Sequence, residues 1–180
     1  MRKLLVALIL LFGLFLDSVL FHQVNLSGAR PDAVLAMMAS LGVLMGGVRG
    51  GVLGAAVGLV ADILYSGQLG LSAIGYMAAG ALGGLFYQKY YADNIVIPAL
   101  VAVAGAFFKE NVMAVAAWLS GAEFSYFRVL ASCILPCMLL TGAFCMPVHA
   151  VLKKLFAGQV RGEHASPRDR AHSGHIGGVR

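Results

Sequence analysis

The sequence predicts an all-α polytopic membrane protein, a bundle of six transmembrane helices followed by a short polar tail. Of its 180 residues, 60% are hydrophobic and 12% are charged, and the mean hydropathy is +0.86. Soluble chains carry roughly 25% charged residues, and a chain of this size cannot bury so much apolar surface away from water. Within lipid, only helices and closed barrels pair all of their backbone polar groups. Apolar runs such as residues 94–108 lack the alternation of barrel strands and therefore indicate helices.

The apolar runs divide the chain into six predicted helices, because a hydrocarbon core about 30 Å thick needs roughly 17–25 residues per span. The first run follows Arg2 and Lys3, as in a signal peptide, but it is long and no small-residue cleavage site follows it closely. We therefore expect an uncleaved helix. Pro31 and Asp32 open the second helix, since proline suits a first turn and a carboxylate suits the positive end of the helix dipole. The predicted spans are residues 4–21, 32–47, 50–65, 71–87, 94–120 and 129–152.

The basic residues divide unequally between the two ends of these helices. With six helices, one side holds Arg2, Lys3, Arg49, Lys89, Lys153 and Lys154, and the other holds Arg30 and Arg128. Lys and Arg are enriched in cytoplasmic flanks, so both termini are expected in the cytoplasm. Basic residues that flank apolar runs in this way are topology signals, and we expect no nucleic-acid partner. We expect a transmembrane domain over residues 1–154 and a disordered basic tail over residues 155–180, whose composition cannot form a core.

Glycine recurs every four residues through the second, third and fourth predicted helices. This spacing places small residues on one helix face, where two helix backbones can approach closely. Packing inside the bundle is the main interpretation, and a face for docking a partner is the alternative. The glycines concerned are Gly42, Gly46, Gly50, Gly54, Gly58, Gly80 and Gly84.

Four ionisable residues lie inside apolar segments: Asp17, Asp62, Lys109 and Glu110. Such residues are costly in lipid and usually face a partner or a cavity. Lys109 lies about 11 residues before the end of its helix, or roughly 16 Å at 1.5 Å per residue. We expect a structural ion pair between Lys109 and Asp62, because Glu110 is adjacent and cannot face Lys109 on a helix. A proton or substrate site and a contact with a partner protein are the alternatives.

The sequence contains no arrangement that is typical of an enzyme or a metalloprotein. No serine accompanies a histidine in a catalytic pattern, and no His-Glu-x-x-His is present. Asp62 lacks the Gly-x-Gly-Asp setting of intramembrane aspartyl proteases. Cys133, Cys137 and Cys145 share one apolar segment, where packing is the expected role. We therefore expect no catalytic residue, no metal site and no cofactor.

A series of short motifs follows the second to fourth helices. Pro31 and Asp32 open a helix, a glycine-rich stretch follows, Asp62 precedes a Ser-Gly turn at Gly67, and Gly70 starts a Gly-Leu-Ser-Ala run. Their order and spacing, over about residues 30–90, resemble the MreD family of bacterial rod shape-determining membrane proteins. The first, fifth and sixth helices match that family only in hydropathy.

This resemblance implies a six-helix fold similar to the substrate-binding S components of energy-coupling-factor vitamin transporters. It also implies a non-enzymatic part of the cell-elongation machinery in the bacterial cell membrane. The implied partners are membrane lipid, an MreC-like protein, and the elongation peptidoglycan synthases, which are RodA-like and penicillin-binding proteins. The alternative function is that of an S component itself. Leu11 weakens it, because these components carry a second alanine four residues after the one that matches Ala7. The outer loops are also poor in the polar and aromatic groups of a ligand pocket.

Overall fold

The structure, a computed structural model, describes residues 2–23, 30–65, 69–86 and 95–163, and side chains only between residues 6 and 155. Gly67, Lys89 and the part of the predicted tail at residues 164–180 lie outside the described residues. Every element of the described ranges is helical, which confirms the all-α prediction. The elements are α1 (Arg2–Gln23), α2 (Ala33–Met45), α3 (Gly47–Tyr65), α4 (Leu71–Leu85), α5 (Val96–Leu119), α6 (Tyr126–Val129), the π-helical turn η1 (Leu130–Ile134) and α7 (Leu135–Glu163).

Six apolar helical segments correspond to the six predicted spans. Three of them are long and apolar enough to cross a membrane, namely Gly47–Tyr65, Val96–Leu119 and Tyr126–Leu155. The other three are shorter: Val6–Ser18, Ala33–Met45 and Leu71–Leu85. The helices fit a multi-pass membrane protein, and the count of six complete spans stays a prediction.

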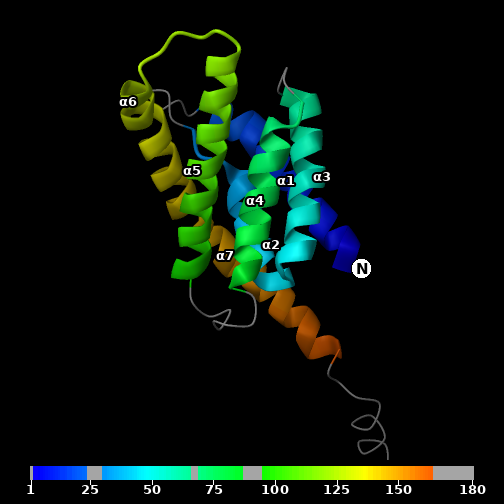
Figure 1. The fold of residues 1–180 in the computed structure, drawn as a ribbon. Coiled ribbons are helices and arrows are strands. Elements are labelled where there is room, and N and C mark those ends of the chain that lie inside the picture. The colour runs from blue at the N-terminus through cyan, green and yellow to red at the C-terminus, as the bar shows by residue number, and fades with distance from the viewer. Residues whose placement is uncertain (1, 24–29, 66–68, 87–94, 164–180) are drawn as a thin grey trace, which may run out of the picture.

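The short helix α2 is the centre of the bundle. Every residue from Ala33 to Val43 is buried, and α1, α3, α4, α5 and α7 all pack against it (Figure 1). At 1.5 Å per residue, its 13 residues extend about 20 Å, which is less than the roughly 30 Å of a bilayer core. At least one end of α2 therefore lies inside the apolar layer, where its unpaired backbone groups need partners from the protein.

Glycines allow the backbones of α3 and α4 to touch. A Cβ atom on Gly50 would lie 2.7 Å from the Gly80 carbonyl oxygen, and one on Gly58 would lie 2.7 Å from the backbone nitrogen of Ala73. No real Cβ contact is that short, so larger residues at these positions would separate the helices. Cβ atoms would overlap backbone in the same way at Gly42, Gly54, Gly80 and Gly84.

Gly46 differs from the other glycines of the row. Its φ of 93° lies in a region that L side chains rarely adopt, and its N–H donates 2.9 Å to the Gly42 carbonyl oxygen. It ends α2, and α3 begins at the next residue. Gly46 therefore makes the sharp turn between two helices, and its backbone also lies close to α4, since a Cβ atom on Gly84 would lie 2.8 Å from its carbonyl carbon.

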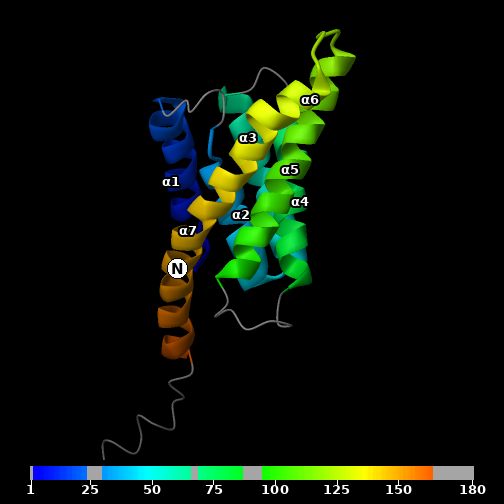
Figure 2. The same cartoon turned by 90° about the vertical axis from the view of Figure 1, so that its left-hand side faces the viewer.

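The last predicted span is longer than residues 129–152. It begins at Tyr126, contains the π-helical turn before Pro136, and crosses the bundle obliquely as α7 (Figures 1 and 2). Pro136 has no backbone N–H to donate to the carbonyl oxygen of the residue four positions earlier, and the wider π-helical turn accommodates the missing hydrogen bond. The helix continues to Glu163, past the predicted boundary at residue 154, because residues 153–163 are mostly good helix formers. Near α6, the end of α5 extends beyond the other helices (Figure 2).

Candidate functional site

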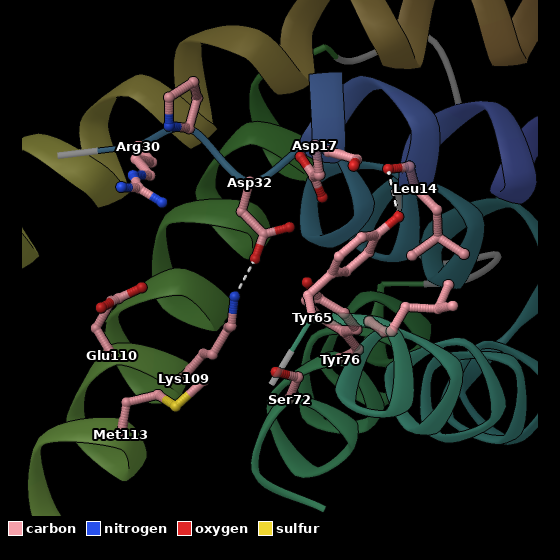
Figure 3. A pocket seen from close by; sticks show the side chains of 14 residues that line it. Leu14, Asp17, Arg30, Asp32, Tyr65, Ser72, Tyr76, Lys109, Glu110 and Met113 are labelled. Carbon is pink, nitrogen blue, oxygen red and sulfur yellow. Dashed lines mark hydrogen bonds and ion pairs between the residues drawn. The ribbon is translucent and has the colours of Figure 1, made fainter. Parts of the chain in front are cut away.

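A polar cavity of about 690 Å³ lies beside the start of α2, among α1, α3, α4 and α5 (Figure 3). It brings together three of the four intramembrane ionisable residues singled out in the sequence, namely Asp17, Lys109 and Glu110, but not Asp62. The polar residues that line it are Asp17, Ser18, Arg30, Asp32, Tyr65, Ser72, Tyr76, Lys109 and Glu110.

Lys109 pairs with Asp32, and the predicted pairing of Lys109 with Asp62 is wrong. The Lys109 ammonium donates to Oδ2 of Asp32 (Figure 3), and the two side chains are only 13% and 8% exposed. The same ammonium lies 4.9 Å from the centre of the Tyr76 ring, close enough for a cation–π contact. Asp32, at the start of α2, thus meets Lys109 near the middle of α5.

The first turn of α2 receives carboxylates from two helices. Oδ1 of Asp32 accepts a hydrogen bond from the Leu35 backbone N–H at 2.8 Å, as a helix N-cap does. Asp17, from α1, accepts from the N–H groups of Ala33 at 2.7 Å and Val34 at 3.2 Å. Three of the N–H groups that a helix start leaves unpaired are thus satisfied, and the acceptor oxygens face the positive end of the helix dipole.

Helix α7 also contacts the residues at the start of α2. The Asp32 N–H donates to Oγ1 of Thr141 at 3.1 Å. The Cys137 thiol donates to the Arg30 carbonyl oxygen at 2.9 Å and lies 3.7 Å from a Glu110 carboxylate oxygen. Side chains from α1, α4, α5 and α7 therefore converge on the residues that start α2. We call Asp17, Asp32, Tyr76, Lys109 and Thr141 the α2 node.

Asp62 performs for α4 the role that Asp17 performs for α2. Its side chain is fully buried and accepts hydrogen bonds from the N–H groups of Gly70 at 2.8 Å, Ser72 at 3.2 Å and Ala73 at 3.3 Å. Gly70 has a φ of 99°, a left-handed conformation that glycine adopts without strain. Each of the two Asp residues thus caps the start of the next helix along the chain.

The contacts of the α2 node connect helices. Both oxygens of Asp17 and both oxygens of Asp32 accept hydrogen bonds from named donors. Within the described part of the chain, no three His, Cys, Asp or Glu side chains are placed to hold a metal ion. The cavity beside the node has room for a small group, and Glu110 and Arg30 lie along one side of it (Figure 3).

Sequence reasoning missed the Asp32–Lys109 pair and the contributions of Tyr76, Thr141 and Cys137. The spacing of Pro31 and Gly46 contained a usable signal, because it limits α2 to fewer residues than a full span needs. A helix that short has at least one end within the apolar layer, where a charge such as that of Asp32 would require a cation. The outer-loop argument also missed the cavity, since most of its lining residues lie on helices.

The comparisons with known proteins agree with the motifs of residues 30–90. The family model of the rod shape-determining protein MreD matches residues 1–157. No curated protein and no solved structure gives a significant match. The family match extends over α1, α5 and most of α7, which resembled the family only in hydropathy. It therefore covers nearly the whole chain, and the protein belongs to the MreD family of rod shape-determining proteins.

Proposed function

We propose that this protein is a non-enzymatic scaffold of the rod-shape machinery, holding an MreC-like protein and the elongation peptidoglycan synthases together in the bacterial cell membrane. The observation that carries this proposal is the family match to residues 1–157. The apolar helices fit a multi-pass protein of the cytoplasmic membrane, and we propose that both termini face the cytoplasm. A fold similar to that of S components is part of the proposal. The function of a vitamin-transporter component gains no support from the family match.

The α2 node supports a scaffold rather than an enzyme. Its carboxylates hold helix starts and a lysine, and these contacts join α1, α2, α4 and α5. A catalytic base or nucleophile needs an available lone pair within reach of a substrate. The node instead resembles a set of fixed connections, and a rigid bundle suits a protein whose task is to position its partners.

The exposed end of α5 and the start of α6 form the surface that we propose for docking. Trp118, Leu119 and Phe127 are 67%, 73% and 81% exposed, and a hydrogen bond of 2.6 Å from the Tyr126 hydroxyl to Asn111 holds α6 against α5. We call residues 118–127 the aromatic tip. Trp and Tyr are also common at membrane interfaces. The extension of α5 beyond the other helices favours contact with a protein (Figure 2), since Trp and Tyr dominate binding hot spots.

Recovery of the partners from native membranes tests the proposal. A tagged chain should co-purify with the MreC-like protein and the synthases. The double variant Trp118→Ala/Phe127→Ala should lose at least about tenfold of that recovery, because hot-spot truncations cost about 2 kcal/mol or more. The matched control is Leu100→Ala/Leu139→Ala, which truncates two side chains that are each 62% exposed elsewhere on the bundle. Equal recovery with the tip variant contradicts the docking surface, and no recovery with the unmodified chain contradicts the scaffold.

A further inference from the structure

A second cavity, about 930 Å³ in volume, lies between α1 and α3, on a different part of the bundle from the α2 node. Its lining is apolar except for one residue, Arg49. The lining side chains come from α1 (Val6, Ala7, Leu10, Leu11 and Leu14), the end of α2 (Met45) and α3 (Val48, Arg49, Val52, Leu53, Ala56, Val57 and Val60). We call this cavity the α1–α3 groove.

The two ends of the α1–α3 groove differ. Beyond Val60, the Tyr65 hydroxyl donates a hydrogen bond of 3.3 Å to the Leu14 carbonyl oxygen, which joins α3 to α1. At the other end, Arg49 lies in the first turn of α3. The groove is therefore crossed at one end by a contact between its two walls, and it has a positive charge at the other.

Arg49 is available to a ligand. Its side chain is exposed, and it forms no ion pair or hydrogen bond with another residue that the structure describes. An arginine guanidinium binds phosphate through two parallel hydrogen bonds and is the side chain best suited to that geometry. A basic residue at the end of a transmembrane helix lies at the level of the lipid headgroups.

The length of the groove matches one lipid leaflet. Arg49 and Val60 are 11 residues apart on α3, or about 16 Å at 1.5 Å per residue. Half of a bilayer core of about 30 Å is about 15 Å. We propose that the α1–α3 groove binds one acyl chain of an anionic phospholipid whose phosphate pairs with Arg49. This site is independent of the proposed docking surface at the aromatic tip.

A partner helix fits the groove less well than an acyl chain does. A transmembrane helix is about 10–12 Å wide with its side chains and needs about 20 residues to cross the bilayer. The link between Tyr65 and Leu14 would obstruct it before it reached the other membrane surface. An acyl chain enters from the headgroup level and ends near the middle of the bilayer, as the groove does.

Lipid retention tests the proposal with a defined probe. The full chain is reconstituted into vesicles of equal parts phosphatidylglycerol and phosphatidylethanolamine, extracted in mild detergent, and analysed by native mass spectrometry. We expect the unmodified chain to retain one phosphatidylglycerol. Arg49→Gln should lower that retention at least about fivefold, since one basic residue at an anionic surface contributes about that factor. Ala56→Phe, which fills the groove from an exposed position, should abolish retention of both lipids.

Two matched controls separate this site from general lipid contact. Lys154→Gln removes an exposed positive charge from α7, and Ala104→Phe adds the same ring to an exposed position on α5. Both should retain phosphatidylglycerol as the unmodified chain does. The proposal is overturned if Arg49→Gln or Ala56→Phe retains as much lipid as its control. It is also overturned if a photo-crosslinking residue at Val52 attaches to a protein rather than to a lipid in native membranes.

Discussion

Removing the ammonium from the α2 node should destabilise the bundle more than any other single charge deletion near the cavity. In Lys109→Met, Oδ2 of Asp32 loses its cation, while Oδ1 keeps the Leu35 N–H. The pair is 13% and 8% exposed, so bulk water solvates the remaining carboxylate poorly. Breaking a buried pair from one side costs about 3–5 kcal/mol, because a lone charge remains buried. We expect a loss of that size in the free energy of unfolding.

The double variant should be more stable than this single loss implies. Asn at position 32 can still cap α2 but carries no charge, so Lys109→Met/Asp32→Asn removes both charges of the pair. We expect a coupling energy of at least about 2 kcal/mol between the two sites, within the range measured for residues in contact. The assay is a double-mutant cycle on detergent-extracted protein. Unfolding is followed by the loss of tertiary fluorescence and helicity as a denaturing detergent is titrated in.

A second cycle, with Lys109→Met and Asp62→Asn, is the control. Asp62 binds backbone N–H groups of α4 and belongs to a different set of contacts. We expect those two effects to add within about 0.5 kcal/mol, as independent sites do. The reasoning about the α2 node is refuted if the effects of Lys109→Met and Asp32→Asn on the free energy of unfolding also add. It is equally refuted if Asp62→Asn couples to Lys109→Met as strongly as Asp32→Asn does.

Three further predictions follow from the fold. Gly54→Leu should lower stability by about 1–3 kcal/mol through overpacking, whereas Ala104→Leu, on an exposed part of α5, should change it little. Equal losses in the same unfolding assay would contradict the close helix contact. Asp62→Ala should lower the free energy of unfolding by about 0.5–2 kcal/mol because the α4 cap is lost, and Asp62→Asn should have an intermediate effect. Hydrogen exchange should become faster at the start of α4; faster exchange elsewhere instead would show that Asp62 has another role. Reporter fusions after Lys89 and after Leu152 should both read cytoplasmic, and a periplasmic signal at either site would contradict the predicted topology.

The sequence located the apolar helical segments because hydropathy and helix punctuation are local signals. Pro31 and Asp32 precede α2 as predicted, and the start of α4 at Leu71 was predicted to the residue. Four-residue glycine spacing likewise identifies helix faces that can approach closely. The structure places Gly50, Gly54 and Gly58 of α3 against the backbone of α4.

The pairing of charges could not be predicted because it depends on depth and on helix neighbours. By sequence alone, Asp62 and Glu110 were the candidate partners of Lys109, and the actual pairing with Asp32 depends on the central position of α2 in the bundle. The cross-helix caps made by Asp17 and Asp62 depend on loop geometry in the same way. Sequence patterns locate such residues on a helix but give no register between helices.

Depletion of this protein in its own bacterium tests the central claim most directly. Cell width, cell length and the position of newly inserted peptidoglycan are measured as the protein disappears from the membrane, with an unmodified plasmid copy as the control. The proposed role predicts that cells widen and lose their rod shape, that insertion along the side wall stops, and that the plasmid copy restores both. Cells that keep their width and their side-wall insertion after the protein is gone would contradict a role in rod-shape determination.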